Sequence, residues 1–96
     1  MMFETDIIVN QMPAFKKAYK TIGGKQKLQI NLAIQRIIEN PEIGEVKRGD
    51  LSGVYVYKFK IDLQEMLLAY EWDSEQRFLL ALGVHENFYR DLKKQL

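Results

Sequence analysis

Two apolar runs near the end of the chain constrain the fold more than any other feature. Residues 65–72 and 77–84 are each long enough for a buried strand, and a polar turn over residues 73–76 separates them. Two such runs joined by a short polar turn are typical of a β-hairpin. The sequence therefore predicts that these segments pair in antiparallel fashion inside a sheet.

The segments before this hairpin predict a strand, two helices and another strand. Residues 3–9 end in a β-branched run, and Pro13 suits the first position of a helix that stops at two glycines, residues 23 and 24. A longer helix over residues 25–39 ends at Asn40 and Pro41. Residues 41–53 are polar and irregular, and residues 54–61 alternate as a strand does. The apolar stripe of the longer helix comprises Ile30, Ala33, Ile34, Ile37 and Ile38, and Leu28 and Leu32 widen it.

A short C-terminal helix completes the expected fold. Phe88, Leu92 and Leu96 recur every four residues, which indicates one apolar helix face. The order β-α-α-β-β-β-α predicts an α+β domain with a small antiparallel sheet, on which the N-terminal helical hairpin packs. Ninety-six residues suffice for a single domain, 1–96, and 47% hydrophobic residues support a real core.

Composition narrows the classes of function. The chain has no cysteine and one histidine, so we expect no metal site and no cofactor. Residues 1–6 lack the basic and apolar regions of a signal peptide, and no apolar stretch reaches the length of a membrane span. We therefore expect a cytoplasmic protein. Its net charge of +1 is not that of a strong non-specific binder of nucleic acid.

His85 is the first candidate for chemistry. It follows Gly83, where the last apolar run ends, and a strand end can hold a side chain rigidly while leaving it open to a ligand. The unperturbed pKa of histidine allows proton transfer near neutrality. If the segment continues as a helix, Tyr89 lies one turn after His85. The alternative is a surface histidine that caps the last helix.

Basic residues follow two patterns. Lys58 and Lys60 share one face of the strand predicted over residues 54–61, where they can bind phosphates or protect an edge strand from pairing. Residues 16–27 contain five lysines and no acid, which fits a solvated helix face as well as a surface for RNA or a partner. Lys47 and Arg48 lie in the irregular segment before the strand.

Several short motifs together resemble the RelE/ParE superfamily, the toxins of bacterial type II toxin–antitoxin modules. These are the order and size of the elements, Leu51-Ser52-Gly53 before the second strand, and the closing run from Gly83 to Tyr89. The resemblance covers essentially the whole chain. It implies a toxin that a cognate antitoxin neutralises. Members built like RelE cut mRNA, usually on the ribosome, whereas members built like ParE inhibit DNA gyrase and are not nucleases.

For the RelE-like branch, the resemblance implies an mRNA interferase, a metal-independent endoribonuclease. Such cleavage needs the 2′-hydroxyl deprotonated, the phosphorane charge stabilised and the leaving oxygen protonated. His85 occupies a position that holds histidine or arginine in mRNA-cleaving members, and Tyr89 a position that is aromatic in the YafQ-like branch. We therefore expect both in catalysis. The residues expected to bind RNA phosphates are Lys47, Arg48, Lys58, Lys60 and Arg90.

One departure from the family pattern leaves other functions open. Many RelE-like members carry an arginine three residues before a tyrosine at the start of the third strand, and this chain keeps Tyr70 but has Leu67 at that position. The YafQ-like branch shares this loss, which favours histidine as the catalytic group. A ParE-like gyrase inhibitor and a non-catalytic module that binds an antitoxin remain the alternatives.

Overall fold

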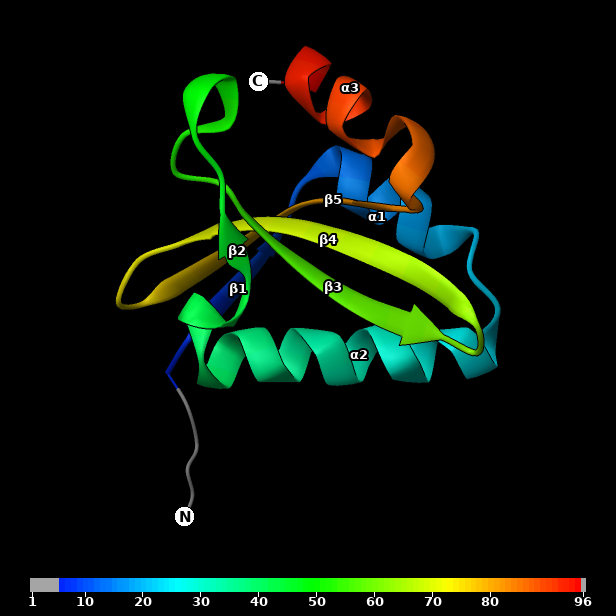
Figure 1. The fold of residues 1–96 in the computed structure, drawn as a ribbon. Coiled ribbons are helices and arrows are strands. Elements are labelled where there is room, and N and C mark those ends of the chain that lie inside the picture. Colours follow the sequence, from blue (N-terminus) through cyan, green and yellow to red (C-terminus); the bar gives the residue numbers. More distant parts are fainter. Residues whose placement is uncertain (1–5, 96) are drawn as a thin grey trace.

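The computed structural model describes residues 6–95, except for the side chains of residues 85–87 and 95. Its α+β architecture confirms the predicted fold class (Figure 1). The described elements are β1 (Ile8–Gln11), α1 (Pro13–Lys20), α2 (Gly24–Glu39), β2 (Glu45–Val46), β3 (Tyr55–Ile61), β4 (Gln64–Trp72), β5 (Gln76–Gly83) and α3 (His85–Gln95). Single 3₁₀ turns cover Pro41–Ile43 and Gly49–Leu51.

The sheet is mixed rather than antiparallel throughout. Its strand order is β1-β5-β4-β3-β2, and the predicted hairpin of β4 and β5 lies at its centre. However, β1 pairs in parallel with β5, with Ile8 opposite Gln76, so the expectation of a purely antiparallel sheet is wrong for this strand. The direction of a strand is set by the path of the intervening chain, which its own residue pattern does not encode.

The polar segment 41–53 also holds more structure than its composition indicates. Glu45 and Val46 form β2, which pairs in antiparallel fashion with Val56 and Tyr55 of β3. The Leu51-Ser52-Gly53 motif follows, where Leu51 is buried and Gly53 has a φ of 89°. Glycine adopts such a positive φ without strain, so the motif turns the chain into β3.

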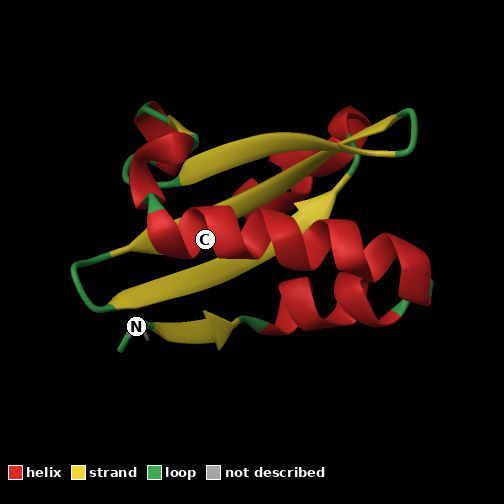
Figure 2. Cartoon of the chain, turned by 90° about the horizontal axis from the view of Figure 1, so that it is seen from below, coloured by secondary structure: helices red, strands yellow, loops and turns green. Residues whose placement is uncertain are grey.

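The helical hairpin covers one face of the sheet. Figure 2 shows α1 and α2 side by side over the strands. Phe15 of α1 and Ile30 and Ile37 of α2 are fully buried in one cluster with sheet residues such as Leu68 and Tyr70. This confirms the predicted packing of the hairpin on the sheet.

The opposite face of the sheet is covered by α3. Phe88 and Leu92 pack against Val56, Leu67 and Ala69 in a second buried cluster. We call this side of the sheet the α3 face. Leu96, the last member of the predicted repeat, lies outside the described residues.

Leu28 and Leu32 differ from their expected role in the core. Their side chains are 63% and 58% exposed. Each is two residues from Ile30, which faces the sheet, and two residues correspond to a rotation of about 200° around a helix. The buried stripe of α2 is therefore narrower than the sequence pattern predicts, and these two leucines lie at the outer surface.

Candidate functional site

The pairing of three strands brings Lys58 close to the start of α3. Lys58 pairs with Leu67 on β4, and Leu67 pairs with Gly83 at the end of β5. Because neighbouring strands lie about 4.8 Å apart, Lys58 and Gly83 are about 10 Å apart across the sheet. His85 begins α3 two residues after Gly83, as predicted, while its side chain lies outside the described part of the structure.

Lys47 follows β2, so it reaches the same region from the opposite side of β3 to Gly83. Its backbone N–H donates to the Val54 carbonyl over 2.8 Å, which continues the pairing of β2 with β3. Its Nζ lies 2.9 Å from Oε1 of Glu45 and 5.1 Å from the centroid of the Tyr89 ring. An ammonium at this distance from an aromatic ring is attracted by its π electrons.

We call Glu45, Lys47, Lys58 and Tyr89 the Lys47 cluster. Glu45 pairs with Val56, and side chains of directly opposite residues share a face of the sheet. Lys58 lies on this face too, because it is two residues after Val56 on β3. Four residues from three separate elements therefore meet on the α3 face.

Charge interactions in the Lys47 cluster favour the ionised forms of Glu45 and Lys47. The hydrogen bond from Lys47, followed by its positive charge, lowers the pKa of Glu45, and the charge of Lys58 lowers it further. In turn, the hydrogen bond to Glu45 raises the pKa of Lys47, and Tyr89 adds a smaller contribution in the same direction. At neutral pH the cluster therefore carries two cations and one carboxylate, a net charge that attracts an anion.

The ring of Tyr89 is held from a second side. Phe88, which is buried in the core, meets it edge to face at a centroid distance of 5.4 Å and an interplanar angle of 87°. Tyr89 is half-buried and follows His85 by one helical turn, as the sequence predicts. The aromatic ring thus lies between the hydrophobic core and the cation of Lys47.

A buried tyrosine positions the segment that leads into β2. The Tyr70 hydroxyl donates to the Pro41 carbonyl over 2.7 Å and accepts from the backbone N–H of Gly44 over 2.9 Å. A Cβ on residue 44 would lie only 2.7 Å from the Tyr70 oxygen, so glycine is required there. Burial raises the pKa of Tyr70. This residue therefore fixes where Glu45 begins β2.

The remaining predicted residues lie away from the Lys47 cluster. Lys60 shares the face of Lys58 but is two residues farther along β3, opposite Glu65. Arg48 follows Lys47 in extended backbone, so its side chain points to the face opposite that of Lys47 and away from the cluster. Arg90 is 67% exposed at its side chain and lies 3.9 Å from Asp91. The structure therefore brings together Lys47, Lys58 and Tyr89, but not Arg48 or Arg90.

Sequence reasoning missed Glu45 and the positioning role of Tyr70. Glu45 and Lys47 are two residues apart, which is the spacing of side chains on one strand face. That signal is present in the sequence, but two residues are too few to distinguish a strand from a loop. The hydrogen bonds of Tyr70 join residues 26 and 29 positions apart, and no local pattern indicates them.

The described residues were also compared with the requirements of a metal site and of a membrane-spanning helix. Among them, no three histidine, aspartate or glutamate side chains gather in a group that could hold a metal ion. None of their helices is both long enough and apolar enough to cross a membrane.

Comparisons with known proteins place the geometry in context. A family described as the ParE-like toxin of type II bacterial toxin–antitoxin systems matches residues 9–93. No curated protein sequence matches the chain.

Solved structures with the same fold include several toxins. A mutant of the E. coli toxin RelE in the free state superposes with a TM-score of 0.72 at 17% identity, covering 94% of this chain and 97% of RelE. A chain of the E. coli RelBE toxin–antitoxin complex gives 0.66 at 20% identity, covering 83% and 98%. The YoeB/ParE toxin from Agrobacterium tumefaciens gives 0.65 at 13% identity, covering 83% and 100%. At these identities the similarity shows the fold alone.

Proposed function

The chain belongs to the ParE-like toxins of type II bacterial toxin–antitoxin systems, and from that membership we propose that it is an mRNA interferase, an endoribonuclease that inhibits translation. The observation that carries this proposal is the meeting of Lys47 and Lys58 beside the start of α3, where His85 lies. Cations next to a proton-transfer group are what metal-independent RNA cleavage requires.

The proposed reaction uses the RNA's own 2′-hydroxyl as the nucleophile. That oxygen loses its proton, forms a bond to the adjacent phosphorus, and the bond from phosphorus to the 5′-oxygen of the next nucleotide breaks. His85 transfers a proton at one of these oxygens and solvent water does so at the other, so the proton lost by the 2′-hydroxyl is balanced by the one gained by the leaving 5′-oxygen. Lys47 and Lys58 stabilise the negative charge that develops on the phosphorane. The product ends are a cyclic phosphate and a free 5′-hydroxyl.

The other basic residues have a secondary role in this proposal. Lys60 is exposed and shares the face of Lys58, so it suits binding of a phosphate farther along the RNA. Arg48 and Arg90 are exposed outside the cluster and suit more distant contacts with ribosomal or messenger RNA. Tyr89 either stacks on a base or keeps Lys47 in place.

Two partners follow from this proposal. One is the ribosome with its bound mRNA, in the cytoplasm. The other is a cognate antitoxin, because the matched family consists of toxins from toxin–antitoxin systems and one structural relative is a chain of the RelBE toxin–antitoxin complex.

A double substitution tests the proposal. Lys58→Ala with Lys60→Ala removes two exposed charges without removing packing, so the protein is expected to fold normally. RNA cleavage, measured by primer extension in a purified translation system, should fall by about a hundredfold. Lys16→Ala with Lys17→Ala on α1 is the matched control, because it removes the same charge elsewhere. Equal losses in both variants would contradict a specific role for β3.

A single observation favours a second candidate, the ParE-like inhibition of DNA gyrase. Leu67 is fully buried between Lys58 and Gly83, at the position where the family resemblance places an arginine in many RNA-cleaving members. The site therefore has one cation fewer than those members. A supercoiling assay with purified gyrase distinguishes the two functions, because an interferase leaves supercoiling unchanged.

A further inference from the structure

The outward side of α2 carries two leucines that the fold leaves exposed. Leu28 and Leu32 are 63% and 58% exposed, and their spacing of four residues makes them neighbours on the helix surface. Figure 2 shows α2 lying across the sheet in front of the strands, so this side of the helix points away from them. Adjacent exposed apolar side chains on a helix favour the docking of a second helix.

These leucines belong to a longer row of residues along α2. The row runs Lys25, Leu28, Leu32, Gln35 and Glu39, at alternating intervals of three and four residues. This spacing is the one by which a helix presents a single seam to another helix. The centre of the seam is apolar, and a cation and a carboxylate lie at its two ends.

The two charges are placed against the dipole of their own helix. Lys25 lies in the first turn, where the helix dipole is positive, and residues 24–27 contain no acid. Glu39 is the last residue of α2, where the dipole is negative, and its Oε2 accepts from Nε2 of Gln35 over 3.0 Å. Within α2 alone, both charges are therefore in unfavourable positions.

An antiparallel second copy of α2 would make both positions favourable. When Leu28 of one copy lies opposite Leu32 of the other, Lys25 lies opposite Gln35 of the second copy, with Glu39 one turn away. The positive end of each helix also lies beside the negative end of the other. The charges that oppose the dipole of their own helix then complement the neighbouring helix.

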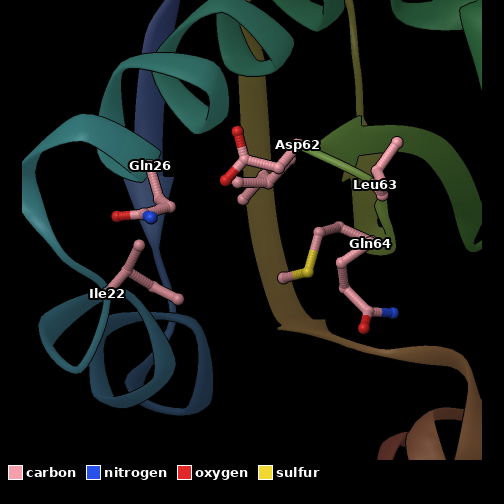
Figure 3. A pocket seen from close by; sticks show the side chains of 7 residues that line it. Ile22, Gln26, Asp62, Leu63 and Gln64 are labelled. Atoms are coloured by element: carbon pink, nitrogen blue, oxygen red, sulfur yellow. The ribbon is translucent and has the colours of Figure 1, made fainter.

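The groove beside α2 supplies a second pair of opposite charges. A hollow of about 500 Å³ lies at the first turn of α2, and Figure 3 shows Asp62 and Gln26 on facing sides of it. Asp62 and Lys25 also line the next hollow along α2, whereas Arg36 lines the following one. A two-fold axis perpendicular to both helices keeps the two grooves on one side of the pair. Arg36 of the second copy then lies near Asp62.

We propose that α2 forms the interface of a homodimer, in which two copies of this chain pair their α2 helices in antiparallel fashion. A two-fold interface brings the same patch of both copies together, which suits a surface that carries both members of each charge pair. The helix axes would lie about 8–10 Å apart, with the four leucines at the centre.

This dimer leaves the candidate site open. α3 packs on the opposite face of the sheet from α2, so the Lys47 cluster lies away from the second copy (Figure 1). The homodimer does not depend on the proposed function, because it involves only α2 and the turn after β3.

Sedimentation equilibrium of the full chain tests the dimer. A contact through one pair of helices is smaller than the standard interface of about 800 Å² per partner, so we expect a dissociation constant in the micromolar range. Between about 1 and 500 µM the mass should therefore rise from that of one copy toward that of two. A parent protein that stays monomeric over this range would leave the face to another occupant and overturn the proposal.

Substitution of the leucines locates the interface. Leu28→Asp with Leu32→Asp changes two exposed residues, so the fold is retained, and this variant should stay monomeric over the same range. Ile8→Asp on β1 is the matched control, because Ile8 is 54% exposed and should dimerise as the parent does. A double variant that dimerises as tightly as the parent would overturn the proposal.

Charge reversal separates dimerisation from folding. Lys25→Glu and Glu39→Lys each introduce a charge that suits the dipole of its own helix, so neither should lower the free energy of unfolding. Each should weaken the dimer by about tenfold, because like charges then meet across the interface. The double variant restores opposite charges and should dimerise within about twofold of the parent. Losses that simply add in the double variant would overturn the antiparallel pairing.

The chain has no cysteine, so an engineered pair can report the direction of the helices. Facing positions in an antiparallel pair fall within the Cα separation of a disulfide, about 4.4–6.8 Å. Lys25→Cys protein mixed with Gln35→Cys protein should therefore form a disulfide-linked heterodimer on oxidation, and each protein alone should link far more slowly. A mixture that links no faster than the separate proteins would overturn the proposal.

Discussion

The ammonium of Lys47 lies 5.1 Å from the centroid of the Tyr89 ring, so the segment after β2 contacts α3. Lys93 of α3 reinforces this junction, because it lies 3.6 Å from Asp50 in the turn after Lys47. The residues concerned are about 40 positions apart in the sequence. Their meeting places a cation held by Glu45 next to the helix that carries His85.

Lys47→Met should therefore lower RNA cleavage while the fold is retained. The substitution keeps an unbranched side chain against Tyr89 but removes the charge, and we expect a loss of about tenfold to a hundredfold. Cleavage is measured by primer extension on a translated mRNA. Lys17→Met, on the exposed surface of α1, should leave the rate unchanged. A Lys47→Met protein that cleaves at the parental rate would remove Lys47 from the mechanism.

Tyr70→Phe should destabilise the protein through the segment before β2. The substitution removes the hydroxyl that bonds the Pro41 carbonyl and the Gly44 N–H. Leaving such groups without their partner lowers the free energy of unfolding by about 1–3 kcal/mol. Chemical denaturation measures the change, and Tyr55→Phe is the control, because the Tyr55 hydroxyl bonds neither group. Equal stability of the two variants would contradict this role of Tyr70.

The raised pKa of Tyr70 gives stability a dependence on alkaline pH. Burial raises the folded-state pKa of Tyr70 above its unfolded value of about 10. The protonated phenol is thus favoured by folding, so its contribution is fully present below pH 10 and is lost as the pH rises through the raised pKa. Unfolding curves above pH 10 should fall more steeply for the parent than for Tyr70→Phe. Parallel curves would show that Tyr70 titrates normally in the folded protein.

Arg77 should be a stability residue without a direct role in chemistry. Its buried guanidinium donates to the carbonyls of Ile37 and Ile38 at the end of α2, over 3.1 and 2.9 Å. Arg77→Met leaves these carbonyls without a charged donor, and the free energy of unfolding should fall by about 3 kcal/mol. At a temperature where the variant remains folded, cleavage should match the parent. A large loss of cleavage in folded protein would indicate an additional role.

The sequence predicts the parts of the fold that have long periodic patterns. The β4–β5 hairpin is predictable because both strands are apolar and the turn at Asp73 is polar. β2 is not, because Glu45 and Val46 are too short a strand to show alternation. The parallel direction of β1 and the exposure of Leu28 both depend on tertiary packing, which local patterns do not report.

For the candidate site, the sequence predicts where single residues lie along the chain but not which distant residues meet. The places of His85 and Lys58 follow from strand ends and alternation, and the structure places both as expected along the chain. The pairing of Lys47 with Glu45 and Tyr89 depends on contacts between distant segments, so the sequence supplies the residue types but not their meeting. Arg48 and Arg90 are basic residues close in sequence to the cluster, yet strand alternation and helix rotation turn them away from it.

The interferase function is tested most directly by measuring translation, mRNA cleavage and gyrase supercoiling side by side for the parent protein and His85→Ala. We expect the parent to block translation with discrete mRNA cleavage and to leave supercoiling unchanged. His85→Ala should cleave at least about a hundredfold more slowly, the usual effect of removing a proton-transfer group. Inhibited supercoiling with intact translation would show that the protein is a gyrase inhibitor, and full cleavage by His85→Ala would remove His85 from the chemistry.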